Sequence, residues 1–260
     1  MKAGVCRAAH DAALALKLLT RFPVPVATAT TEERLAGACA FFPLVGAVVG
    51  AVLAAGHYAL SPIVPPLLVA SLTVASWELV TGGMHLDGLM DSADGILSGG
   101  GRERALEIMR DGRVGAMAVA VAIIVLLVKF AAVASLEGAD ALRGLLLAPV
   151  AGRTNMVVCL GLFPYARPEG MGSFARRVGA PHLVASSLAA VLAAGAVAGP
   201  MGVALLVGSA GATYAFCRRV SGLLGGLTGD TYGAACELSE ATILVLWTML
   251  RDGWSLWLRF

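Results

Sequence analysis

Long apolar segments make up most of this chain and restrict it to one class of fold. Only 14% of its 260 residues are charged, against about 25% in a typical soluble domain, and the mean hydropathy is +0.82. Each segment has roughly 17 to 25 residues, enough for a helix to cross a hydrocarbon core of about 30 Å. The segments cover residues 35–60, 63–80, 116–136, 141–163, 182–198, 201–216 and 232–250. We therefore expect an all-α integral membrane protein, a single domain over residues 1–260, with about six to seven transmembrane helices.

The N-terminal region and the composition refine this expectation. Residues 5–21 carry Ala and Leu on one side and Lys17 and Arg21 toward the other, a pattern typical of a helix lying in the membrane interface. The net charge is +2 and no lysine-rich run is present, so nucleic acid is not expected as a partner. The five cysteines show no CxxC spacing, and we expect them to be small packing residues.

Basic residues are concentrated in alternate loops between the apolar segments. The loops after the second, fourth and sixth segments hold several arginines each, whereas the intervening loops hold at most one, Arg143. By the positive-inside rule, the N-terminus and the arginine-rich loops should face the cytoplasm. The first of these loops, over residues 81–115, should also contain a short acidic helix.

Three aspartates in that loop, Asp87, Asp91 and Asp94, are spaced to share one helix face, within about 60° of each other. Carboxylates at that spacing repel one another unless positive charge lies between them. Mg²⁺ is suited to the position because it binds one or two carboxylates together with substrate phosphates. The triplet therefore predicts a metal-dependent, phosphate-handling site at the membrane edge. The simpler alternative is a solvated acidic helix face.

Glycines accompany two of these aspartates. Gly88 follows Asp87 and Gly95 follows Asp94. Glycine costs a helix about 1 kcal/mol relative to alanine, so a functional reason is expected. We interpret both positions as places where a bulky substrate approaches the backbone.

A second acidic pair begins the last apolar segment. Asp230 and Glu237 are seven residues apart and share a helix face. Carboxylates near membrane depth are costly and usually functional. They could complete the ligands of a metal or orient a nucleophile, and the alternative for Asp230 is a helix cap.

Arginines supply candidate phosphate-binding groups, because the guanidinium matches phosphate oxygens. Arg153 is unusual because it lies inside a span and needs a partner or a wet cavity. The others lie in loops expected on the cytoplasmic side: Arg102, Arg110, Arg113 and Arg167. His85 would point about 160° away from the aspartate face, and we interpret it as structural.

Six segments together carry a family resemblance. They are LTRFPVP (19–25), FPLVG (42–46), GGMHLDGLMDSADG (82–95), EIMRDGRVG (107–115), PYAR (164–167) and TGD (228–230). In this order, and over nearly the whole chain, they resemble the cobalamin synthase (adenosylcobinamide-GDP ribazoletransferase) family. Met90 and Gly112 depart from the residues expected there, and neither change removes a carboxylate.

The resemblance implies a multi-pass enzyme of the prokaryotic cell (inner) membrane that joins adenosylcobinamide-GDP to α-ribazole or its 5′-phosphate, releases GMP and requires Mg²⁺. It implies that Asp87, Asp91 and Asp94 hold the metal. The hydroxyl proton would pass to Asp94, with Asp91 and Asp230 as the alternatives. Substrate contacts would come from Gly88, Gly95, Arg110, Asp111, Arg113, Arg153, Tyr165, Arg167 and Glu237.

Two other functions have to be weighed. A CDP-alcohol phosphotransferase has a related aspartate–glycine pattern, but Met90 and Asp91 occupy its Ala-Arg positions and its final spacing is absent. A cation-coupled transporter would carry acids near mid-bilayer in an inverted repeat, whereas here the acids lie at one rim and no repeat is seen. A homo-oligomer, or a complex with other enzymes of the same pathway, is compatible with the sequence.

Overall fold

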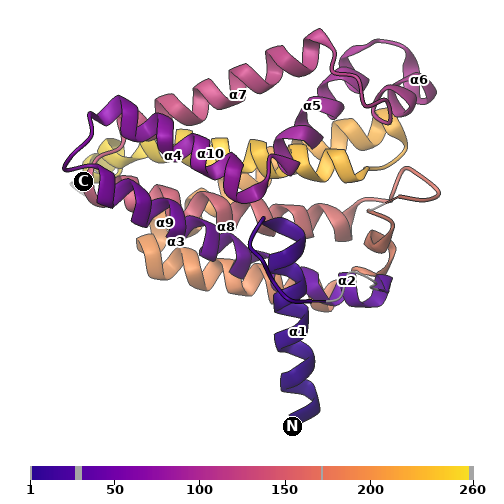
Figure 1. The fold of residues 1–260 in the computed structure, drawn as a ribbon, viewed down its shortest axis with the longest axis horizontal. Helices are drawn as coiled ribbons and strands as arrows, with labels where there is room; N and C mark the ends of the chain where they lie inside the picture. Colours follow the sequence, from indigo (N-terminus) through magenta and orange to yellow (C-terminus); the bar gives the residue numbers. More distant parts are fainter. Residues whose placement is uncertain (1, 27–30, 171, 258–260) are drawn as a thin grey trace.

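The computed structural model describes residues 2–26, 31–170 and 172–257. In chain order its elements are α1 (Lys2–Leu19), α2 (Glu32–Cys39), α3 (Phe42–Leu60), α4 (Pro66–Thr81), α5 (Met84–Leu97), α6 (Gly101–Ile108), α7 (Ala116–Ser135), α8 (Gly138–Leu162), the short 3-10 helix η1 (Ser173–Arg177), α9 (Ala180–Leu224) and α10 (Gly229–Trp257). Among these residues there is no strand, only an isolated bridge between Tyr165 and Leu227. The all-α fold is therefore confirmed (Figure 1).

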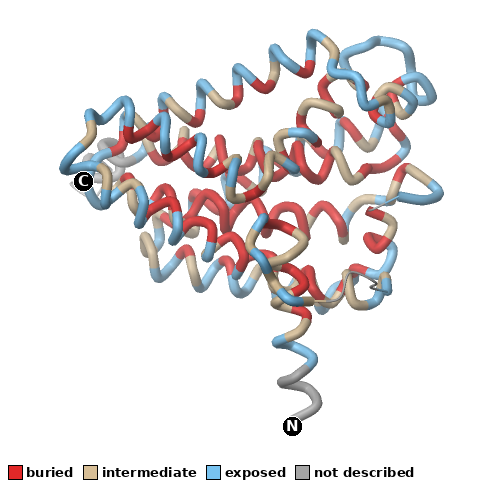
Figure 2. Tube along the Cα trace, in the orientation of Figure 1, coloured by how far each residue is buried: buried red, intermediate tan, exposed pale blue. Residues whose placement is uncertain are grey.

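Helix α8 forms the centre of the bundle. Most of its residues are buried, and it contacts α3, α9 and α10; Figure 2 shows the buried residues concentrated in this layer. The close approach of α3 depends on glycine, because a Cβ at Gly50 would lie 2.8 Å from the carbonyl oxygen of Leu145, and one at Gly46 would overlap the backbone of Pro149. Small residues therefore let these helices pack closely, as is usual in lipid.

Five helices, α3, α7, α8, α9 and α10, are long and apolar enough to cross a membrane. Helix α4 passes the same test only together with α5, and the two are bent by 89°. The bend is made by Gly82 and Gly83, which both have left-handed φ angles, 68° and 67°. Glycine adopts this conformation without the steric penalty that other residues incur. Helix α5 therefore turns away from the crossing direction and lies at one end of the bundle (Figure 1).

Helix α9 contains the fifth and sixth predicted segments as two limbs. Its backbone leaves the helical conformation at Ala198 and Gly199, where φ is −143° and 59°. A Cβ at Gly202 would overlap the carbonyl oxygen of Ala194, although residues eight apart in a continuous helix are about 12 Å apart. The chain must therefore reverse between the limbs. With α9 counted as two crossings, the bundle agrees with the six to seven helices expected.

One predicted segment is interrupted in the structure. The first apolar segment was expected to be helical from residue 35, but α2 ends at Cys39 and α3 begins at Phe42. Pro43 explains the break, because a proline is accommodated only in the first turn of a helix. The N-terminal helix α1 runs across the direction of the bundle helices (Figure 1), as expected for a helix in the interface plane.

The polar motifs gather at one end of the bundle. Helices α5 and α6, the segment after α8 and the start of α10 all lie on the right in Figure 1. This arrangement agrees with the predicted clustering of the acidic residues and the arginine-rich loops on one side. That this end faces the cytoplasm stays a prediction from charge.

Candidate functional site

The site begins with the packing of α5 against the start of α10. A Cβ at Gly88 would lie 2.6 Å from the carbonyl oxygen of Asp230, and one at Gly233 would lie 3.1 Å from that of His85. Glycines on both helices therefore allow their backbones to touch. This contact places the aspartate face of α5 beside Asp230.

The packing revises the interpretation of the two glycines beside the aspartates. Gly88 is needed for the contact with α10. Gly95 is needed for the contact with α6, since a Cβ there would lie 2.8 Å from the carbonyl oxygen of Ala105 and would overlap Met109. Helix packing is sufficient to explain why glycine follows these aspartates, and a contact of Gly88 or Gly95 with substrate stays a prediction. Gly88 also lines a cavity, described below.

Arg167 is brought to Asp230 by a short backbone pairing. Ala166 donates its N–H to the carbonyl oxygen of Leu227 at 2.8 Å, and Leu227 donates to that of Pro164 at 2.8 Å. The pairing fixes the segment around Arg167 against the start of α10. The Nη2 atom of Arg167 then lies 2.9 Å from Oδ2 of Asp230.

A cavity of about 190 Å³ opens between these elements. We call it the central cavity; its polar side chains are those of Asp87, Tyr165, Arg167, Asp230 and Tyr232. Apolar side chains, including Phe42 and Met156, close much of the rest. With Gly88, which also lines the cavity, five of the predicted site residues, from three different parts of the chain, therefore meet at one place.

Asp91 is half-buried beside this cavity. Burial and the neighbouring carboxylates of Asp87 and Asp230 raise the pKa of Asp91 to about 6, against the opposing effect of Arg167. The negative charges therefore remain under-compensated even with the arginine present. A site of this kind is suited to a hard cation that arrives with phosphate oxygens.

Asp94 has different partners from the other two aspartates. Its Oδ2 accepts from the backbone N–H of Gly115 at 2.5 Å, and its Oδ1 accepts from that of Ala118 at 2.8 Å. Both oxygens therefore cap the first turn of α7. Within the described residues no three His, Cys, Asp or Glu side chains are placed to hold a metal together. The metal and base roles of Asp94 stay predictions.

Replacing Asp94 by alanine is expected to destabilise the protein by about 1–2 kcal/mol, the usual cost of losing a helix cap. Asp94→Asn keeps one oxygen that can accept from the backbone and should lose less. The thermal unfolding midpoint of the purified protein in detergent measures both. An Asp94→Ala midpoint equal to that of the parent would contradict the capping role.

Arg110 and Arg113 lie in different surroundings. The guanidinium of Arg113 pairs with Asp111, with Nε 2.9 Å from Oδ2, and this hydrogen bond lowers the pKa of Asp111. Arg110 is exposed and lines, together with Arg167, a second cavity of about 440 Å³. We call this space the outer cavity; Arg102, Glu103 and Glu107 also line it. Arg167 therefore separates the central cavity from the outer cavity.

Arg153 and Glu237, predicted to contact substrate, lie in the interior of the bundle instead. Arg153 pairs with Glu240, and both are fully buried. The Nζ atom of Lys129 lies 2.6 Å from a carboxylate oxygen of Glu237 and 2.6 Å from one of Glu240. None of these residues lines the central or outer cavity. We therefore interpret Lys129, Arg153, Glu237 and Glu240 as a buried ion cluster that stabilises the bundle.

Sequence reasoning overlooked Lys129. The residue is the only charge in the apolar run of α7, residues 116–135. An ionisable side chain inside a span is costly and needs a partner, so its position alone was a sufficient signal. Arg153 was recognised by that rule, and the same rule would have marked Lys129 as a second cation that needs a carboxylate partner inside the bundle.

Comparison with known proteins gives a consistent result over most of the chain. A family model described as cobalamin-5-phosphate synthase matches residues 11–248. Curated relatives named adenosylcobinamide-GDP ribazoletransferase include one from Pseudomonas aeruginosa, 42% identical over 89% of this chain and 95% of the relative. Another, from Acetivibrio thermocellus, is 36% identical over 92% of this chain and 97% of the relative. No solved structure matches.

Proposed function

Because the chain belongs to the cobalamin-5-phosphate synthase family, we propose that it transfers the adenosylcobinamide-phosphate group of adenosylcobinamide-GDP to α-ribazole or its 5′-phosphate. A ribazole hydroxyl oxygen forms a bond to the phosphorus that carries the cobinamide. The bond from that phosphorus to the bridging oxygen breaks, and GMP leaves with the electron pair. The hydroxyl proton passes to a carboxylate of the site.

The central cavity is the observation that carries this proposal. Asp87, Arg167 and Asp230 line it together, and with a cation held by the carboxylates this lining would suit a diphosphate that exchanges one ester partner for another. Catalysis of phosphoryl transfer depends mostly on positioning and charge stabilisation. Arg167, held by Asp230 at 2.9 Å, is oriented to bind phosphate oxygens. Tyr165, at the same wall, can donate a hydrogen bond to them.

Asp87 and Asp91 fit Mg²⁺ better than the full triplet does, because both oxygens of Asp94 already accept from the backbone of α7. Burial, followed by the neighbouring carboxylates of Asp87 and Asp230, raises the pKa of Asp91, and a bound cation would neutralise this concentration of negative charge. When bound, Mg²⁺ would neutralise charge on the diphosphate. With Asp91 assigned to the metal, Asp230, which lines the central cavity, would be the proton acceptor. We place this site on the cytoplasmic face of a prokaryotic inner membrane.

Turnover is tested by incubating the purified protein in vesicles with adenosylcobinamide-GDP and α-ribazole and measuring GMP by chromatography. EDTA is expected to lower GMP release by at least about a hundredfold, since a metal contributes several kcal/mol to such a transition state. Excess Mg²⁺ should restore it. Full turnover in EDTA would refute the metal requirement, and no GMP release under any condition would refute the reaction.

A lipid-making CDP-alcohol phosphotransferase is the chemical class closest to this proposal. The same vesicles, supplied with CDP-diacylglycerol and a free alcohol, should release no CMP. Measuring CMP and GMP release in the same preparation distinguishes the two phosphotransferase activities.

A further inference from the structure

Two arginines beside the site have side chains without a partner in the part of the chain that the structure describes. Among the described residues, neither Arg21 nor Arg110 has an ion pair or a side-chain hydrogen bond, whereas Arg102, Arg113 and Arg167 each pair with a carboxylate. Arg110 lines the outer cavity. Arg21 lines a third space, and its guanidinium is available to an anion from outside the chain.

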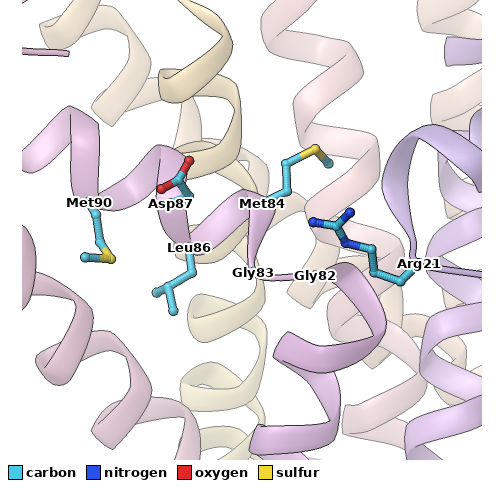
Figure 3. A pocket seen from close by; sticks show the side chains of 7 residues that line it. All are labelled: Arg21, Gly82, Gly83, Met84, Leu86, Asp87 and Met90. Carbon is cyan, nitrogen blue, oxygen red and sulfur yellow. The ribbon is translucent and has the colours of Figure 1, made fainter. Parts of the chain in front are cut away.

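This third space, which we call the corner cavity, lies where α4 turns into α5. Its volume is about 400 Å³, and Arg21, Gly82, Gly83, Met84 and Asp87 are among the residues that line it. Figure 3 shows the guanidinium of Arg21 extended toward the start of α5, with Met84 between it and Asp87. Asp87 lines the central cavity too. The corner cavity is therefore adjacent to the reacting centre.

Arg21 packs against the turn between α4 and α5. Its backbone N–H donates to the carbonyl oxygen of Val80 at 2.8 Å. Its side chain lies across Gly82, where a Cβ would be 2.8 Å from the Cδ of Arg21 and would overlap Nε. The absent side chain at Gly82 thus makes room for Arg21. An exposed arginine without a carboxylate partner, beside such a site, is suited to binding phosphate.

The corner and outer cavities each share one lining residue with the central cavity, so each could hold one of the two groups that bind beside the reacting phosphate. The corner cavity shares Asp87 with the central cavity, and the outer cavity shares Arg167 with it. In-line phosphoryl transfer places the attacking and leaving oxygens on opposite sides of the phosphorus. The acceptor and the departing nucleotide therefore need separate spaces on either side of the central cavity.

The lining residues distinguish the two flanking cavities. The outer cavity is lined by Glu103 and Glu107 together with three arginines, Arg102, Arg110 and Arg167; carboxylates accept hydrogen bonds from the N–H groups of a guanine edge, and arginines bind a nucleotide phosphate. In the corner cavity the charged residues are Arg21 and Asp87. Within the described residues Arg21 forms no ion pair, so this cavity offers one free cation for the single phosphate of an acceptor.

Resting on the proposed function, we propose that the corner cavity binds the acceptor and that Arg21 recognises its 5′-phosphate. Arg21 is then a specificity-determining residue that favours α-ribazole 5′-phosphate over free α-ribazole. The guanine nucleotide leaves through the outer cavity, beside Arg110.

The test compares kcat/KM for the two acceptors in the full-length protein in vesicles, with GMP release as the readout. Arg21→Gln keeps the side-chain length without the charge and is expected to lower the ratio of phosphorylated to free acceptor by roughly ten- to a hundredfold, the effect of one charge-assisted contact. Arg21→Lys should restore part of the ratio. Arg110→Gln is the matched control, and its ratio should equal that of the parent.

The ratio of the two kcat/KM values reports recognition of the acceptor phosphate, because damage to folding would lower kcat/KM for both acceptors alike. An unchanged ratio in Arg21→Gln, with the parent active, would overturn this inference and leave the proposed function standing. A ratio altered by Arg110→Gln instead would also overturn it, by placing the acceptor phosphate in the outer cavity. A parent that releases no GMP with either acceptor would overturn the proposed function itself.

Discussion

Replacing Lys129 by methionine is expected to destabilise the folded protein by about 3–5 kcal/mol, the usual effect of removing one partner from a buried ion pair. The Lys129 side chain is fully buried, and its Nζ lies 2.6 Å from the carboxylates of Glu237 and Glu240 and 3.6 Å from that of Glu78. Without the ammonium, Arg153, which pairs with Glu240, is the one neighbouring cation left to these carboxylates among the described residues. The expected result is a large fall in the thermal unfolding midpoint and in the yield of monodisperse protein.

Two further variants test whether the loss of stability in Lys129→Met is due to the loss of the buried positive charge. Leu127→Met changes an exposed residue of the same helix and should alter stability by less than about 0.5 kcal/mol. Adding Glu237→Gln to Lys129→Met removes one of the unpaired charges and should recover part of the lost stability, because residues in contact are energetically coupled. Lys129→Met protein as stable as the parent would contradict the importance of the cluster.

The ion cluster of Lys129, Arg153, Glu237 and Glu240 shows which part of the fold could be predicted from the sequence and which could not. The helices were predictable because each apolar segment alone has the length and composition of a span. The pairing of Lys129 with Glu237 joins residues 108 positions apart, and hydropathy does not encode which helices become neighbours. Arg153 and Glu237 were therefore recognised as unusual but assigned to substrate, when their partners lie inside the bundle.

The candidate site was predictable to a similar extent. Asp87, Arg167 and Asp230 were chosen from local motifs, and the structure brings them to one cavity. The sequence alone groups Asp94 with Asp87 and Asp91, because their spacing places all three on the same face of a helix. Its backbone partners, Gly115 and Ala118, come 21 and 24 residues later, so only the folded chain distinguishes the aspartates.

Asp91→Asn is expected to lower kcat by on the order of a hundred- to a thousandfold, the usual loss when a charged group of a phosphoryl-transfer site is removed. The change is nearly isosteric and removes one negative charge. Burial and the carboxylates of Asp87 and Asp230 already raise the pKa of Asp91 to about 6, so the charge is held against repulsion in the folded state. Removing it should relieve that repulsion, and the thermal unfolding midpoint should stay level or rise while GMP release falls.

This opposite response of activity and stability distinguishes a functional carboxylate from a structural one. Asp140→Asn is the matched control, because Asp140 lies in the first turn of α8, outside the three cavities, and pairs with Arg143 at 3.7 Å. Its turnover should stay within about twofold of the parent, as is usual for surface changes away from a site. Near-parent turnover in Asp91→Asn would refute its role at the diphosphate. A fall in stability as large as that of Lys129→Met would instead place Asp91 among the residues that hold the bundle together.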